Sequence, residues 1–125
     1  MPKVEVIFFR EEDGTIPFVD WLAALPSAAR AKCLVRLDRL EELGHELRRP
    51  EADYLADGIY ELRAKHAGVN YRMLYFFHGR TAAIASHGIV KQQAAVPPKD
   101  IEKAARRKAQ FDANPRRHTF VPPED

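Results

Sequence analysis

Apolar residues in the first third of the chain predict one strand followed by two helices. The segment KVEVIFFR, residues 3–10, is β-branched and aromatic, which is typical of a strand with apolar side chains on both faces. Apolar positions then recur every three or four residues over 17–25 and again over 27–43, the spacing of two amphipathic helices. Pro26 separates the helices and Gly44 follows the second, so we expect a helical hairpin whose shared apolar stripe packs on a sheet.

Residues 58–91 predict that sheet. They contain three strand-like runs, GIYELRAKH, VNYRMLYFFH and TAAIASHGIVK, separated by Ala67–Gly68 and by Gly79–Arg80. A glycine in the first central position fits a two-residue type II′ turn, which would pair His78 with Thr81. The first turn also allows a bulged loop one residue longer. We therefore expect three consecutive antiparallel strands.

A third helix and a tail complete the predicted fold. The helix runs from Lys99 to about Asp112 with one thin apolar edge, and the tail 113–125 has prolines and no period, so it should be extended or disordered. We expect one domain over residues 1–112, of the α+β class and in the order β-α-α-β-β-β-α. The domain would consist of a small, mostly antiparallel sheet, a helical hairpin on one face of it and a C-terminal helix. The other face of the sheet would be partly open.

Composition narrows the class of protein. With 125 residues, 46% hydrophobic and 30% charged, the chain is typical of a single globular domain. No apolar run approaches the roughly 20 residues of a membrane span, and the start turns acidic where a signal peptide would continue apolar. The lone Cys33 excludes an intrachain disulfide and a cysteine-based metal site. We expect a cytoplasmic protein without membrane contact or cofactor.

Charge is distributed unevenly along the chain. Residues 1–62 hold 8 Lys/Arg and 13 Asp/Glu, whereas residues 63–88 hold 4 basic residues and no acidic one. Residues 89–118 add 8 basic and 3 acidic residues. This asymmetry favours a polyanionic partner on one side of the molecule, although a solvated charged surface gives the same pattern.

The expected register brings several cations together. Two-residue turns would place Arg63 opposite Arg72 and Arg72 opposite His87, with Lys65 and Lys91 on the same face. Like charges opposite each other cost up to about 1 kcal/mol, so such a row indicates a functional site. Guanidinium groups match phosphate oxygens in pairs, which makes a phosphodiester backbone the simplest partner.

Two alternatives remain open for this row. A bulge at the first turn would slip one strand and disrupt it. An acidic residue from elsewhere, such as Asp53 or Asp57, would pair the arginines inside the protein. The remaining histidines show no ligand spacing, so a metal site is not expected.

The segment from about residue 50 to 108 resembles the phage-derived HigB-like branch of the RelE/ParE toxin superfamily. That branch combines a Leu-x-Asp-Gly-aromatic-Glu-Leu-Arg run, Tyr-Arg-x-x-Tyr-Phe, His-Gly-Phe-x-Lys-Lys and a Pro-led helix. The matching residues here are Leu55, Asp57, Gly58, Tyr60, Glu61, Leu62, Arg63, Tyr71, Arg72, Tyr75, Phe76, His87, Gly88, Lys91, Pro97 and Ala104. Ile89 and Gln92 replace the family's aromatic residue and second lysine.

The resemblance implies the toxin of a type II toxin–antitoxin pair, an endoribonuclease that cuts mRNA in the ribosomal A site. Its partners would be the ribosome, mRNA and a small HigA-like helix-turn-helix antitoxin. The resemblance also assigns RNA contact or catalysis to Arg63, Arg72 and Lys91. The two departures leave an alternative, a RelE-like binding or regulatory module whose chemistry is weakened or lost.

Metal-free RNA cleavage needs a base, a charge stabiliser and an acid. We expect Arg63 and Arg72 to clamp the phosphate, with Lys91 as a further clamp, or as an acid if its cationic neighbours depress its pKa. His87 would shuttle a proton, with His66 at the hairpin tip as a substitute. Alternatively, His87 is a structural residue bonded to backbone.

Further RNA contacts are expected from two kinds of side chain. Lys65 extends the basic face, and Tyr60 and Tyr71 would stack on an unpaired base, unless they are core residues. Arg106 and Arg107 lie on the third helix, where they form either a surface for ribosomal RNA or a solvated helix face.

Overall fold

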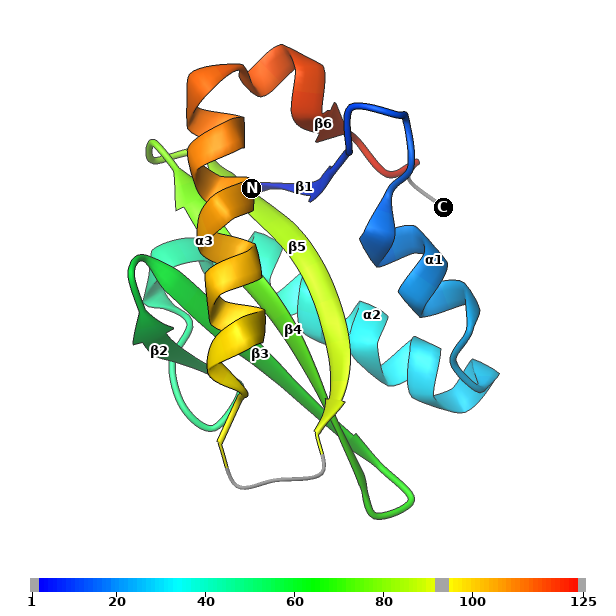
Figure 1. Cartoon of the computed structure of the whole chain (residues 1–125). Helices are drawn as coiled ribbons and strands as arrows, with labels where there is room; N and C mark the ends of the chain where they lie inside the picture. Colours follow the sequence, from blue (N-terminus) through cyan, green and yellow to red (C-terminus); the bar gives the residue numbers. More distant parts are fainter. Residues whose placement is uncertain (1–2, 92–94, 124–125) are drawn as a thin grey trace.

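A six-stranded sheet in the order β2-β3-β4-β5-β1-β6 forms the centre of the computed structural model, which describes residues 3–91 and 95–123 (Figure 1). The strands are β1 (Glu5–Phe9), β2 (Ala52–Ala56), β3 (Ile59–His66), β4 (Val69–His78), β5 (Ala82–Lys91) and β6 (Thr119–Phe120). The helices are α1 (Pro17–Ala23), α2 (Ser27–Leu43) and α3 (Pro98–Ala113), with short 3-10 turns at Gly44–Glu46 and Pro115–His118. Within the described residues, no helix combines the length and apolar character that a membrane span requires.

The predicted α+β class and mostly antiparallel sheet are confirmed. All neighbouring strands pair antiparallel except β1 and β5, which are parallel. As a central strand, β1 is buried on both sides: Val6 and Phe8 face one core, Ile7 and Phe9 the other. This explains its apolar residues on both faces.

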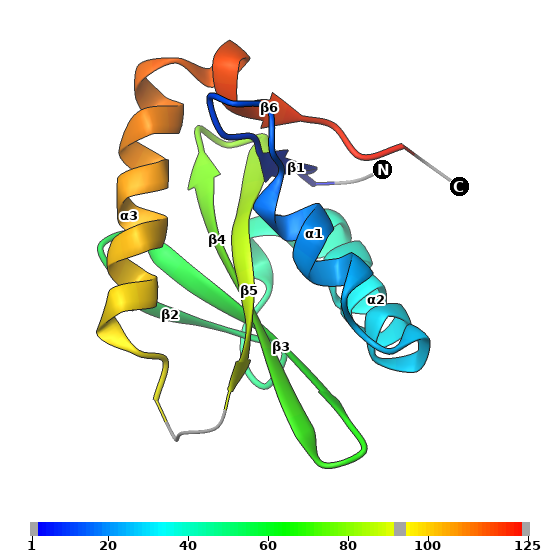
Figure 2. The same cartoon turned by 45° about the vertical axis from the view of Figure 1, so that its right-hand side comes forward.

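Helices cover both faces of the sheet. The hairpin of α1 and α2 lies on one face and α3 lies across the other (Figures 1 and 2). Ala104 and Phe111 of α3 pack into a second core with Leu74 and Phe76 of β4. The second face is therefore less open than the sequence suggests, because α3 packs on its centre.

Gly88 on β5 lets α1 approach the sheet. A Cβ atom at this position would lie 2.2 Å from the indole ring of Trp21, far inside van der Waals contact. The side chain of Trp21 thus occupies the space that any other residue at position 88 would need.

Two short edge strands were not predicted. β2 pairs with β3, and β6 pairs with β1 through Phe8 and Phe120. The tail is consequently ordered through residue 120, contrary to the disordered alternative. His118 fixes it, because its ring stacks on Phe9 at 4.9 Å and its Nδ1 lies 2.8 Å from the carbonyl of Arg10.

The β-hairpin of β3 and β4 has the expected register. His66 pairs with Val69, so the turn contains two residues, Ala67 and Gly68, both with positive φ. Positive φ at both positions is the type I′ geometry, whose twist matches that of the strands. Arg63 therefore lies directly opposite Arg72, as predicted.

The β-hairpin of β4 and β5 differs from the prediction in two places. His78 pairs with Ala82 instead of Thr81, so the turn has three residues. Farther along, a bulge leaves Ser86 unpaired between Ala85 and His87. Before the bulge, residues 82–85 are shifted by one position and so face the side opposite to the prediction. After Ser86 the two one-residue shifts add, so that part of β5 keeps the predicted face but slides by two positions.

Candidate functional site

Arg63 and Arg72 share one carboxylate. Glu61 lies two residues before Arg63 on β3, hence on the same face of the sheet. Its Oε2 accepts a hydrogen bond from Nη2 of Arg63 at 2.9 Å, and its Oε1 lies 2.9 Å from Nε of Arg72. We call these three residues the arginine cluster. The prediction that the cations face only an outside anion is therefore wrong, because Glu61 lies between them.

A second carboxylate joins from the edge strand. Asp53 on β2 pairs with Glu61 in the sheet, and its Oδ2 lies 3.4 Å from Nη2 of Arg63. The same oxygen lies 2.8 Å from Arg49, whose hydrogen bond is the main cause of the lowered pKa of Asp53. The alternative that Asp53 pairs the arginines is correct in part, whereas Asp57 occupies the turn between β2 and β3, with φ 54°.

The members of the arginine cluster differ in exposure. The side chain of Arg63 is 30% exposed, whereas those of Arg72 and Glu61 are 11% and 4% exposed. Burial lowers the pKa of Arg72 and the nearby Glu61 opposes that shift, so the guanidinium stays charged. Arg63 is therefore the member that solvent, or a ligand, reaches most easily.

Hydrogen bonding in the cluster is incomplete. Oε1 of Glu61 and Nε of Arg72 are close, but their geometry is not that of a hydrogen bond, and neither has another partner among the described residues. Within residues 3–91 and 95–123, Nη1 of Arg63 also makes no hydrogen bond. The cluster thus retains N–H donors that its own carboxylates do not use.

His87 does not belong to the predicted row. It lies opposite Leu74, while Ile89 lies opposite Arg72, because of the longer turn and the bulge. Its Nδ1 is 2.8 Å from Oγ of Ser86 and its Nε2 is 3.2 Å from Oδ1 of Asp100 at the start of α3.

The environment of His87 gives it a structural role. Burial, followed by the charge of Arg107, lowers its pKa from 6.5 to about 4. The ring is therefore neutral near pH 7 and connects β5 to α3 through side chains, whereas the alternative interpretation expected backbone bonds. A neutral, 6%-exposed imidazole is a poor proton shuttle.

The other predicted basic residues of the sheet lie near the turn between β3 and β4. Lys65 is exposed and pairs with Asn70, whose other neighbour in the sheet is Lys91. The register therefore places both lysines beside Asn70, on the face of Arg63. The side chain of Lys91 lies outside the described part of the structure, as does Gln92. His66 ends β3 and faces the opposite side by alternation.

The two predicted tyrosines lie on the face opposite the arginine cluster. The ring of Tyr71 is buried and packs edge-on against Trp21 at 6.3 Å, so no base can stack on it in this structure. Tyr60 stacks on Tyr75 at 5.4 Å and packs against the α2-side core. The core interpretation describes both residues.

The two arginines of α3 point in different directions. Arg106 is exposed, whereas Arg107 turns inward: Nε lies 3.2 Å from Glu11, Nη1 donates to the carbonyl of Ser86, and the guanidinium lies over Phe9. Arg107 therefore attaches α3 to β5 and β1, which corrects its assignment to RNA contact or to a solvated face.

The sequence interpretation missed Glu61, although a signal existed. Residues 61 and 63 share a strand face, so a carboxylate two positions before an arginine could be expected beside it.

Among the described residues, no three His, Cys, Asp or Glu side chains cluster as metal ligands would.

Comparison with known proteins gives one family. The family model "Phage derived protein Gp49-like (DUF891)" matches residues 20–109, from within α1 to within α3, and thus covers the arginine cluster. No curated protein matches the chain. The chain therefore belongs to the phage-derived Gp49-like family, a family of the RelE-like toxin group.

Proposed function

We propose that this protein is the toxin of a type II toxin–antitoxin pair, of the HigB-like branch, and a metal-independent endoribonuclease that cuts mRNA on the ribosome. Its family supports a role related to toxin–antitoxin systems. The observation that carries the nuclease proposal is Nη1 of Arg63, which makes no hydrogen bond within the described residues, on a side chain that Glu61 and Asp53 hold in place.

The contacts assign different roles to the two arginines. Arg63 is exposed enough to bind a phosphate through Nη1 while Nε and Nη2 remain on Glu61. Arg72 is nearly buried, so we assign it to holding Glu61 rather than to a first contact with RNA. A guanidinium fixed in this way loses little side-chain entropy when the substrate binds.

The proposed reaction uses the 2′-OH of the RNA as nucleophile. That oxygen gives its proton to water and bonds to the phosphorus, forming a 2′,3′-cyclic phosphate as the bond to the 5′-oxygen breaks. Negative charge develops on the non-bridging oxygens in the transition state, and Arg63 would stabilise it. Lys65 and Lys91 flank the same face beyond Arg63 and would contact the adjoining phosphates. Lys91 remains our candidate for the acid that protonates the leaving oxygen.

Mapping of RNA 5′ ends after induction tests the proposal. In cells that express the chain without an antitoxin, we expect growth arrest and new 5′ ends within translated codons. Blocking translation initiation should abolish the new ends. Growth arrest without new ends would contradict the nuclease assignment.

A second candidate is a RelE-like binding or regulatory module without cleavage activity. The pairing of Arg63 with both Glu61 and Asp53 favours it, because internal carboxylates compete with an incoming phosphate. This candidate predicts salt-sensitive binding to ribosomes and intact transcripts.

We also propose a helix-turn-helix antitoxin as the partner protein. Its support is the family's relation to toxin–antitoxin systems. Co-expression with the product of an adjacent short reading frame should restore growth.

A further inference from the structure

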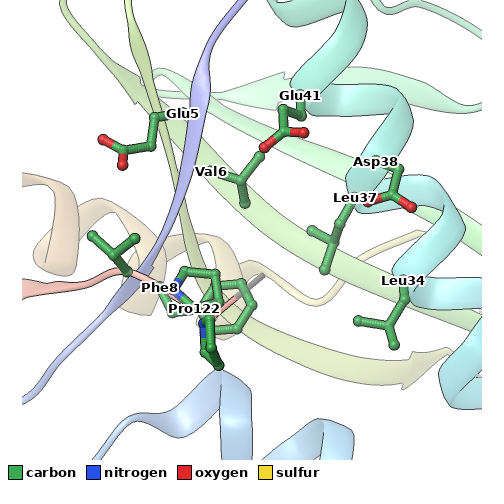
Figure 3. Close-up of a pocket in the computed structure, with 10 residues that line it drawn as sticks. Glu5, Val6, Phe8, Leu34, Leu37, Asp38, Glu41 and Pro122 are labelled. Carbon is green, nitrogen blue, oxygen red and sulfur yellow. The ribbon is translucent and has the colours of Figure 1, made fainter. Parts of the chain in front are cut away.

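A groove of about 500 Å³ lies between α2, β1 and residues 121–123 (Figure 3). Val6 and Phe8 of β1 and Leu37 of α2 form its apolar floor and belong to the core under the helical hairpin. Since the arginine cluster lies on the α3 side of the sheet, the groove opens on the opposite face. A ligand bound here would leave that cluster uncovered.

The wall formed by α2 is part apolar and part acidic. Leu34, Leu37, Asp38 and Glu41 line the groove and follow the spacing i, i+3, i+4, i+7, so they form one stripe of the helix. Figure 3 shows the Asp38 and Glu41 side chains on this wall. Leu34 is 41% exposed and Val121, across the groove, is 54% exposed. Apolar side chains on both sides of the groove are thus left in contact with water.

The acidic residues of the groove have no cationic partner. Among the described residues, no Lys, Arg or His lies within ion-pair distance of Asp38, Glu41 or Glu5, the third acidic residue of the lining. The next acidic residue of α2, Glu42, is by contrast paired with Arg39 at 3.0 Å. Neighbouring like charges at i, i+3 on a helix oppose each other, and a cation from outside would relieve that repulsion.

We propose that this groove binds a short amphipathic segment of a partner protein. Its apolar side chains would enter between Leu34 and Phe8, and its Lys or Arg side chains would pair with Asp38 and Glu41. Charge complementarity favours such a segment over a nucleic acid, which the carboxylates would repel. Anchors three or four residues apart, flanked by basic residues, are the pattern by which a helix binds a groove. The inference does not depend on the proposed nuclease activity.

Peptide selection on the full-length protein tests the inference. A library of displayed random peptides is selected on the wild-type chain after depletion on the double variant Asp38→Lys/Glu41→Lys. We expect enriched sequences with apolar residues at spacings of three or four and with Lys or Arg between them. Synthetic copies of the enriched peptides should shift the amide resonances of β1, of residues 34–41 and of Val121.

Matched variants distinguish binding in the groove from non-specific attraction of a basic peptide to acidic residues elsewhere on the protein. Asp38→Lys/Glu41→Lys should weaken peptide binding about tenfold or more, whereas Asp20→Lys/Glu102→Lys, with the same change in net charge, should leave it unchanged. Both should retain the wild-type circular dichroism spectrum. Failure to enrich peptides, enrichment of acidic peptides, shifts confined to other faces, or self-association of the chain through this groove would overturn the proposal.

Discussion

Oε1 of Glu61 and Nε of Arg72 lie 2.9 Å apart inside the sheet face, yet the N–H of Arg72 is not directed at that oxygen. Both side chains are almost fully buried, so their attraction is weakly screened by water. The same carboxylate binds Arg63 through its other oxygen. Glu61 thus sets the spacing of two guanidinium groups that would otherwise repel each other.

Removing Glu61 should therefore destabilise the fold. Glu61→Ala leaves the buried Arg72 charge without its counterion, which typically costs about 3–5 kcal/mol in the free energy of unfolding. Urea denaturation at neutral pH measures this loss. Glu102→Ala, at an exposed position of α3, should change stability by less than about 0.5 kcal/mol.

A double-mutant cycle separates the ion pair from lost packing. Glu61→Gln/Arg72→Met should be more stable than Glu61→Gln alone, because the uncompensated charge is removed together with its partner. The single variant Arg72→Met completes the cycle, and losses of stability that add in the double variant would show that Glu61 and Arg72 do not interact.

The pH dependence of stability should report on His87. Its pKa is about 4 in the folded chain and its usual value is 6.5, so between these pH values the unfolded chain binds more protons. The free energy of unfolding should therefore fall by about 3 kcal/mol as the pH drops from 7 to 4. Urea denaturation at intervals of half a pH unit measures this slope.

The His87 contribution is isolated by variants. His87→Gln should flatten the curve between pH 6.5 and the acid range where carboxylates protonate, whereas His66→Gln, at the hairpin tip, should leave the slope unchanged. An equally steep curve for His87→Gln would show that another group causes the pH dependence.

Gly88→Ala should disrupt the packing of α1 on β5. Its new Cβ would lie 2.2 Å from the Trp21 ring, and overpacking of this kind costs about 1–3 kcal/mol. Thermal unfolding measures the change. Gly88→Ala/Trp21→Leu should recover part of the loss, whereas an unchanged melting temperature for Gly88→Ala would contradict the close approach.

The sequence was sufficient for the features that depend on local pattern. The helical hairpin followed from apolar spacing and Pro26, and the pairing of Arg63 with Arg72 followed from the two-residue turn at Ala67 and Gly68. The short strand β6 was missed because its two residues pair with β1, at the other end of the chain. β2 was also missed, although it pairs with β3 across the Asp57–Gly58 turn, and Asp-Gly is a local signal for a hairpin.

The contacts of the candidate site were harder to predict from the sequence, because they depend on packing between elements. A bulge at Ser86 depends on packing and moved His87 away from Arg72. Arg107 and Asp100 reach β5 from α3, the next helix, and their contacts with Ser86 and His87 depend on how that helix packs on the sheet, for which the sequence has no local signal. Glu61 was missed as well, although alternation along β3 puts it on the same face as Arg63 and was a local signal.

Cleavage of a ribosome-bound message by purified protein tests the central claim most directly. The substrate is an mRNA in programmed ribosomes with an empty A site, and the proteins are the wild type, Arg63→Ala and Arg80→Ala. Arg80 lies exposed in the β4–β5 turn, so its variant matches the loss of charge. We predict cleavage by the wild type and Arg80→Ala, and a rate lower by about 100-fold or more for a folded Arg63→Ala. Wild-type rates for Arg63→Ala, or no cleavage by the wild type, would contradict the assignment of Arg63 as the phosphate contact of a nuclease.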